Sequence, residues 1–233
     1  ALVLDPQYVS AHVNIGNALN QMGRYDESGP HLLKSLKLNP NLPQVHNNLG
    51  LMYHEGKNLL DEAIESFTKA LSLSPDFSEA HYNLGTALQE LRKFDAATQS
   101  YENALTIKPG YFEAYYSLGT IFHELNQFST AIKNYEKAIV IKPDYAEAYN
   151  NLGIVLIELG RVDEAENCYR NAISLNSEFA GAYYNLGNLL NDLGISPRSP
   201  LEEAETCYRK AISIAPNFFL AYNNLGNLVK TLG

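Results

Sequence analysis

The sequence is poor in the motifs on which enzyme and metal sites are commonly built. Cysteine occurs twice in 233 residues, and there is no Cys-x-x-Cys pair or glycine-rich phosphate loop. His54-Glu55 and His123-Glu124 lack the second histidine of a zinc-protease helix. Such motifs supply metal ligands, phosphate-binding amides and nucleophiles. We therefore expect no enzyme activity in this segment, with no catalytic residue, metal site or cofactor.

Basic charge and long apolar segments are also scarce. The net charge is −9, and the 17 lysines and arginines form no cluster. Nucleic acids and anionic membranes attract proteins through basic patches, so neither partner is expected. No apolar run approaches the roughly 20 residues that a membrane-spanning helix needs, and the sequence shows no signal-peptide pattern, which an excerpt of a longer protein could have lost. Together with the absence of an Asn-X-Ser/Thr site, this favours a cytoplasmic or nucleocytoplasmic protein.

Internal repetition is abundant. An Asn-Leu-Gly tripeptide, or a near version of it, occurs seven times, and its glycines are separated by 34, 35, 34, 34, 34 and 39 residues. A series of prolines has the same period, with Ser177 where one proline is due. A period near 34 is typical of a solenoid of helix-turn-helix units, which binds partners more often than it catalyses. The glycines are Gly16, Gly50, Gly85, Gly119, Gly153, Gly187 and Gly226.

Residues 78–111 illustrate one unit. Apolar and small residues from Ala80 to Leu91 have the spacing of one helix face, and a second helix begins near Phe94. Pro109 lacks the amide that a continuing helix needs, so the second helix is expected to end just before it. Two alanine columns and one aromatic column recur at fixed places in the second helices, which predicts close helix packing.

Numbered from residue 78, these features are Leu and Gly at places 7 and 8, Ala at 20 and 27, Tyr or Phe at 24 and Pro at 32. This pattern resembles the tetratricopeptide repeat (TPR) family over essentially the whole chain. The first repeat departs most, with Ser28 and Ser35 at the alanine places and Leu32 at the aromatic place. The resemblance implies an all-α, right-handed superhelical solenoid of antiparallel helix pairs, whose first helices line a concave groove.

The expected domain is a single TPR array over residues 1–233. Residues 1–8 correspond to the tail of a preceding repeat, and residues 219–233 to the first helix of a further one. Neither end has the polar cap with which arrays usually finish, so we interpret the chain as an excerpt; the alternative is a complete protein with a lone closing helix. The six repeats between the ends are expected at 9–42, 43–77, 78–111, 112–145, 146–179 and 180–218.

Asparagine occupies place 6 in six of the seven first helices, and we call this set the asparagine ladder. Asparagine is a mediocre helix former, so its recurrence needs a reason. Its amide can bond a neighbouring repeat, or it can bind the backbone of an extended peptide. O-GlcNAc transferase and Spindly-type proteins grip peptides with such a ladder, and the resemblance implies the same role here. The ladder is Asn14, Asn48, Asn83, Asn151, Asn185 and Asn224.

Acidic residues at place 13 are expected on the same face, at Glu90, Glu124, Glu158 and Asp192. They either select a neutral or basic partner or serve only solubility. Family members that bind acidic chaperone tails use lysines and an arginine on this face, and these are absent here. Chaperone tails are therefore not expected as partners.

Three further features have simple explanations. His12, His46 and His81 fill the aromatic packing place 4 rather than forming a metal column. Cys168 and Cys207 are expected as thiols, because equivalent stacked helices lie about 8–10 Å apart and a disulfide needs alpha carbons within about 7 Å. The Ser196-Pro197-Arg198-Ser199-Pro200 segment is either a tolerated loop insertion or a phosphorylation site.

These observations predict a non-catalytic scaffold that binds an extended or disordered polypeptide in an Asn-lined, acidic concave groove. The alternative is the substrate-recognition region of a multidomain enzyme, such as a glycosyltransferase of the O-GlcNAc transferase type. A catalytic domain elsewhere in the full-length protein would favour the alternative.

Overall fold

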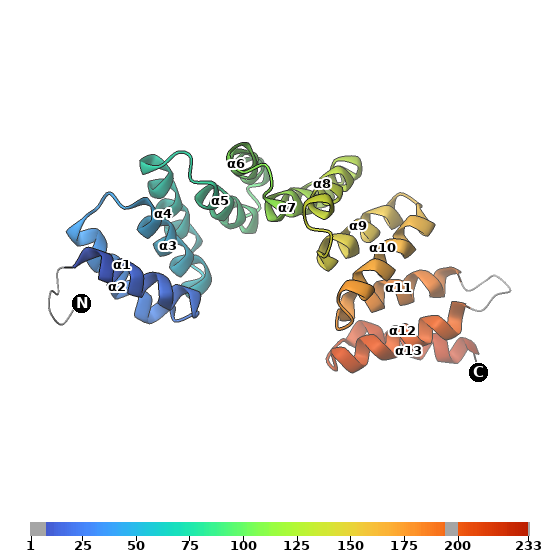
Figure 1. Ribbon diagram of the computed structural model, residues 1–233. Helices are drawn as coiled ribbons and strands as arrows, with labels where there is room; N and C mark the ends of the chain where they lie inside the picture. The colour runs from blue at the N-terminus through green and yellow to red at the C-terminus, as the bar shows by residue number, and fades with distance from the viewer. Residues whose placement is uncertain (1–7, 194–199, 233) are drawn as a thin grey trace. The chain divides into compact units, whose positions relative to one another are not determined.

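The computed structural model describes residues 8–193 and 200–232, and within them it contains helices and no strand (Figure 1). This confirms the all-α fold class. The expected helix tail at residues 1–7 and the insertion at residues 196–199 lie outside the described part. The α-helices are α1 (Val9–Gln21), α2 (Tyr25–Leu38), α3 (Pro43–Leu51), α4 (Leu60–Leu73), α5 (Ser78–Glu90), α6 (Phe94–Ile107), α7 (Phe112–Glu124), α8 (Phe128–Ile141), α9 (Ala146–Glu158), α10 (Val162–Leu175), α11 (Ala180–Leu193), α12 (Pro200–Ile214) and α13 (Phe219–Leu232).

The chain forms two compact units, Ala1–Ser117 and Leu118–Gly233. In the first unit α1 packs on α2, α3 on α4 and α5 on α6, and contacts of α2 with α3 and of α4 with α5 join successive pairs. In the second unit α9 packs on α10 and α11 on α12, while α10 contacts α11 and α12 contacts α13. The first helices α9, α11 and α13 also contact one another in order, so they share one face of that unit.

From the second repeat to the sixth, an aromatic ring of the second helix packs on the glycine of the first helix, and in the first repeat Leu32 packs on Gly16 instead. A β-carbon built on Gly153 would lie 2.6 Å from the Tyr169 ring, and one on Gly85 would lie 2.7 Å from the Tyr101 ring. No side chain fits there, so the glycine is required by close approach. The aromatic rings are buried, as expected: Phe67, Tyr101, Tyr135, Tyr169 and Tyr208.

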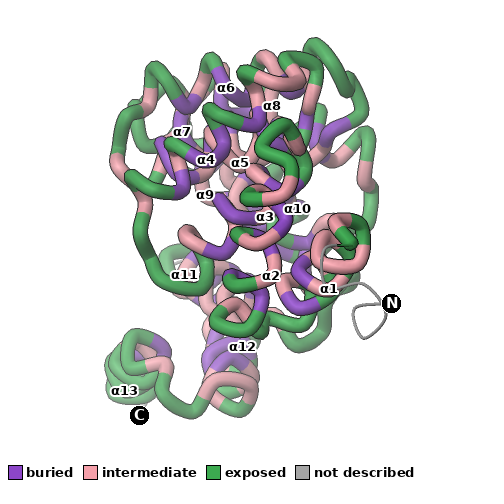
Figure 2. Tube along the Cα trace, turned by 90° about the vertical axis from the view of Figure 1, so that its left-hand side faces the viewer, coloured by how far each residue is buried: buried purple, intermediate pink, exposed green. Residues whose placement is uncertain are grey.

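The alanine columns lie on either side of these rings in the second helices and are fully buried. Small side chains let neighbouring helices approach closely, which gives dense packing with little side-chain entropy to lose. The columns are Ala63, Ala97, Ala131, Ala165 and Ala204 at place 20, and Ala70, Ala104, Ala138, Ala172 and Ala211 at place 27. Figure 2 shows that α13 is exposed over most of its length.

In the first repeat, the serines that stand at the alanine places form hydrogen bonds. Ser28 and Ser35 are fully buried, and their hydroxyls donate to the backbone carbonyls of Gly16 (2.8 Å) and Leu32 (2.7 Å). A buried hydroxyl that has a partner avoids the cost of desolvation. Leu32 fills the aromatic place and is itself fully buried. Serine therefore replaces alanine here without an unpaired polar group.

The single extra residue of the second repeat is absorbed in its first helix. After α3 the chain continues as a π-helix, Met52–Gly56, and then turns through Asn58, which has a φ of 51°. A π-turn accommodates one inserted residue without breaking the helix. The other turns between paired helices place Gly23, Arg92, Asn126 or Gly160 in the left-handed region, as helix C-termini commonly do.

The second helices end two residues before the periodic proline, as at Ile107 and Pro109 or Ile141 and Pro143. The residue before a proline is disfavoured in the α-region, which explains the position of the end. Within the described residues, no helix combines the length and the apolar character that crossing a bilayer requires.

The contact between glycine and ring can be tested by adding one methyl group. Gly153→Ala should lower the free energy of unfolding by about 1–2 kcal/mol, because overpacking outweighs the gain in helix propensity. Gly226→Ala is the matched control, since it is the same place in α13 and nothing lies within 4 Å of its added carbon. It should raise stability by up to about 1 kcal/mol. Urea denaturation followed by helical circular dichroism measures both, and equal effects would refute the packing argument.

Candidate functional site

The asparagine ladder lies on the first helices, in both units. Asn48, Asn83, Asn151, Asn185 and Asn224 are partly buried, and Asn14 is exposed. The first unit contains Asn14, Asn48 and Asn83, and the second contains Asn151, Asn185 and Asn224. A half-buried amide on a helix face can reach both a neighbouring helix and solvent, so the two roles considered for the ladder are compatible with its position.

Four ladder residues bridge to the preceding repeat. Asn83 donates its Nδ2 to Asn47 Oδ1 at 2.9 Å, and Asn48 donates in the same way to Asn17 Oδ1. In the second unit, the corresponding bonds of the ladder run from Asn185 to Asn150 (2.9 Å) and from Asn224 to Asn188 (2.8 Å). These bonds join the first helices of successive repeats and show a structural role for the four asparagines.

The bridges also orient the amides. Nδ2 of Asn83 and of Asn185 uses one of its two hydrogens in the bridge, and no described donor bonds to the side-chain oxygen of either residue. Asn151 differs, since its Oδ1 accepts from Nδ2 of Asn150 at 3.1 Å. The ladder is therefore not uniform: the side-chain oxygens of Asn83 and Asn185 have no described donor, whereas that of Asn151 already accepts one bond.

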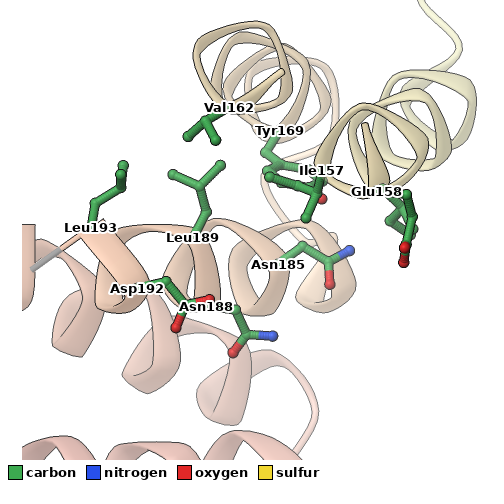
Figure 3. Close-up of a pocket in the computed structure, with 10 residues that line it drawn as sticks. Ile157, Glu158, Val162, Tyr169, Asn185, Asn188, Leu189, Asp192 and Leu193 are labelled. Atoms are coloured by element: carbon green, nitrogen blue, oxygen red, sulfur yellow. The ribbon is translucent and has the colours of Figure 1, made fainter. Parts of the chain in front are cut away.

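A cavity of about 410 Å³ lies beside the ladder in the second unit, between α9, the start of α10 and α11 (Figure 3). In Figure 3, Leu189 and Leu193 extend from α11 toward Val162, whereas Asn188 and Asp192 leave the same helix on another side. The cavity brings three predicted site residues together, namely Glu158, Asn185 and Asp192. Its remaining lining is Ile154, Ile157, Val162, Tyr169, Asn188, Leu189 and Leu193.

A second cavity, of about 270 Å³, occupies the equivalent position in the first unit, between α1, the start of α2 and the α3 segment. It contains the ladder residue Asn48. Its lining is otherwise mainly polar: Asn17, Asn20, Gln21, Tyr25, Leu51 and Glu55. Asn20 Oδ1 is buried there and accepts no bond from the described residues, while its Nδ2 donates to the Asn48 carbonyl at 2.7 Å. Matching places of two successive first helices, with the second helix between them, thus line a cavity in each unit.

The predicted acidic residues Glu90, Glu124, Glu158 and Asp192 are all exposed. Glu90 is engaged, because its Oε1 lies 2.7 Å from Nε2 of His54 in the preceding repeat. Among the described residues, Glu158 and Asp192 have no ion-pair partner. The two carboxylates that line the larger cavity therefore keep their charge available.

The histidines and cysteines are packed or bonded within the fold. His46 and His81 place Nε2 2.9 Å and 3.0 Å from the carbonyls of Pro40 and Pro75. Cys168 and Cys207 are buried thiols, and burial raises the pKa of each to about 11. A thiol of such high pKa is a poor nucleophile at neutral pH. In the described part of the chain, no three His, Cys, Asp or Glu side chains are grouped to hold a metal ion.

Sequence reasoning missed the partners of the ladder and the apolar part of the cavity. The acceptors Asn47 and Asn150 are at place 5, and Asn17 and Asn188 are at place 9. The residue at place 5 and the residue at place 9 differ from repeat to repeat, so no column of identical residues pointed to these acceptors. A search for an amide at place 5 or 9 before each ladder residue would have found all four.

The bridging role can be tested by comparing two ladder residues. Asn185→Ala removes the donor to Asn150, which is 6% exposed, and leaves its oxygen unpaired. We expect a loss of about 1–3 kcal/mol in unfolding free energy, partly offset by helix propensity. Asn14→Ala removes no described bond and should change stability by at most about 0.5 kcal/mol. Urea denaturation of both variants is the measurement; equal losses would contradict the bridge.

Family models match most of the sequence. The model described as TPR repeat matches residues 16–56, 57–91 and 119–160. Two models described as Tetratricopeptide repeat match residues 144–217 and 78–111. No curated protein matches the sequence significantly.

Solved structures show the same fold. The chain resembles MamA, with 30% identity, a TM-score of 0.64 and coverage of 74% of this chain and 93% of that chain. It resembles YrrB, described as a TPR protein with an unusual peptide-binding site, at 24% identity and a TM-score of 0.64, covering 82% and 96%. The pilF protein of Pseudomonas aeruginosa has 17% identity and a TM-score of 0.81, covering 94% and 96%, and shows the fold alone. With its periodic glycines, buried aromatic and alanine columns and these matches, the chain belongs to the tetratricopeptide repeat family.

Proposed function

We propose that this chain is a non-catalytic protein-interaction scaffold that binds an extended or disordered polypeptide along its first helices. The observation that carries the proposal is the pair of equivalent cavities beside the asparagine ladder. A helix pair that served only as a spacer could use half-buried amides to join repeats, but it would not need the adjoining cavities. The description of YrrB as having a peptide-binding site supports the proposal by analogy.

The hydrogen bonding of the ladder indicates what it would bind. Since Nδ2 of Asn83 and of Asn185 is used between repeats, each presents an oxygen that can accept from a peptide N–H. An extended peptide exposes such donors regularly and independently of its side chains. The ladder would thus join the repeats and contact backbone at the same time, which combines the two roles weighed for it.

The charge of this face indicates a preference among peptides. Glu158 and Asp192 are exposed and have no ion-pair partner among the described residues. Together with the net charge of −9, they would favour neutral or basic segments and repel acidic chaperone tails. The buried thiols of Cys168 and Cys207 fit the reducing cytoplasm or nucleoplasm, where we place the protein.

The same face would also serve as the substrate-recognition region of a larger enzyme, of the O-GlcNAc transferase type. The feature that favours this second candidate is the ladder itself. Mass spectrometry of the full-length protein and an assay for sugar transfer to the bound polypeptide would separate the two, since a scaffold retains its partner unmodified.

Peptide contact by the ladder can be separated from its structural role. Asn185→Ala with Asn224→Ala should weaken binding of unstructured fluorescent peptides by roughly two- to tenfold per residue, because each lost bond contributes about 0.5–1.5 kcal/mol. Asn167→Ala with Asn171→Ala, on exposed positions of α10, is the control and should leave affinity unchanged. Fluorescence anisotropy, normalised to the folded fraction, is the measurement. Unaltered affinity in the ladder variant would mean that these asparagines only join repeats.

The charge preference gives an independent test. A lysine-containing peptide should bind more tightly than its glutamate-containing counterpart, and raising ionic strength to about 0.5 M should reduce the difference through screening. Anisotropy titrations at low and high salt measure this. Tight binding of an acidic chaperone-tail peptide at both salt concentrations would contradict the proposed preference for neutral or basic peptides.

A further inference from the structure

We propose that the larger cavity is a selectivity pocket for one aliphatic side chain that stands next to a lysine or arginine in the bound peptide. The inference rests on the proposed function and names the class of ligand. The cavity's walls are formed by Ile154, Ile157, Val162, Leu189 and Leu193. Its volume of about 410 Å³ falls within the roughly 300–1,000 Å³ typical of ligand sites.

The two equivalent cavities differ in chemistry at matching places. Place 9 is Ile154 in the larger cavity and Asn17 in the smaller one, and place 12 is Ile157 and Asn20. Equivalent helices form both cavities, apart from the π-helical end of α3 in the smaller one, and the residues at places 9 and 12 change from amide to aliphatic. An apolar wall beside solvent gains free energy by covering an apolar side chain, whereas an amide wall does not. We therefore assign the selection of an apolar peptide side chain to the larger cavity, in the second unit.

Two carboxylates at the cavity indicate which residue would stand next to the inserted aliphatic residue in the peptide. Glu158 on α9 and Asp192 on α11 line the same cavity from two helices, and both are exposed. No described cation pairs with either of them. A lysine or arginine adjacent to the inserted side chain would supply the complementary charge at the rim, and an acidic residue there would be repelled.

Two oriented amides provide contacts for the backbone between these side chains. Asn188 Oδ1 accepts from the Tyr208 hydroxyl at 2.9 Å and from Asn224 Nδ2 at 2.8 Å, so its NH₂ group is the part left to donate. Asn185 donates its Nδ2 to Asn150 and keeps its oxygen to accept. One donor and one acceptor on the same helix match the carbonyl and N–H of an extended peptide.

Four synthetic peptides on a neutral Gly-Ser-Thr background test the inference: one with Leu-Lys, one with Leu alone, one with Lys alone and one with neither. We expect the Leu-Lys peptide to bind the 233-residue chain at least tenfold more tightly than the background peptide, by fluorescence anisotropy. Ile154→Asn with Ile157→Asn installs the residue type found at these places in the first repeat and should abolish the leucine preference. Glu158→Gln with Asp192→Asn should abolish the lysine preference and keep the leucine preference.

Val140→Asn with Ile141→Asn, at exposed positions of α8, is the matched control for the apolar change and should alter neither preference. Denaturation curves confirm that each variant is folded. Equal binding of all four peptides, with weakening by the ladder variant, would overturn the pocket while leaving the proposed function intact. Binding of none of them would overturn both. Loss of the leucine preference in the α8 control as well would also overturn the pocket.

Discussion

The fold depends on the contact between an aromatic ring and a glycine that has no side chain. In the second to sixth repeats, the ring at place 24 of the second helix occupies the space that a β-carbon at place 8 of the first helix would need, as Tyr169 does at Gly153, and in the first repeat Leu32 takes this position. This contact sets how closely the paired helices approach, and the alanine columns allow the next helix to approach as closely. Burial keeps the ring in place, and it raises the pKa of Tyr101 to about 12, so this phenol stays neutral and donates to Gln89 at 2.9 Å.

Under the proposed function, stacking and recognition would share the same residues on the first helices. A repeat is stabilised largely by its neighbours, so groups that join successive first helices contribute directly to the stability of the array. The bridging asparagines are such groups, and at Asn83 and Asn185 the side-chain oxygen has no described donor. Rigid, oriented acceptors cost less to engage than flexible ones, because their side-chain entropy has already been lost. This explains how residues that are structural in the free protein can also suit a peptide backbone.

The repeated scaffold allows the lining of the first helices to vary without changing the fold. The Ala, Gly and aromatic places carry the packing and leave places 9, 12 and 13 free to differ among repeats. Between the two cavities, isoleucine replaces asparagine at places 9 and 12 while the surrounding helices keep the same pairing. Variation at these places changes the lining, and at place 9 also the bridges, since Asn17 and Asn188 accept from ladder asparagines, while the buried glycine, alanine and ring contacts are kept.

The sequence by itself determined the helical fold, the family and the buried columns, because these depend on local periodicity and on contacts repeated at one spacing. It also located the ladder, and Glu158, Asn185 and Asp192 as residues of one face. The tertiary structure decided what those residues do to one another: which amide Asn185 meets, that His54 engages Glu90, and that Ile154 and Leu189 enclose a cavity. Such pairings join residues more than thirty positions apart at places that vary between repeats. No single-sequence periodicity records them, because they depend on the distance and angle between stacked helices.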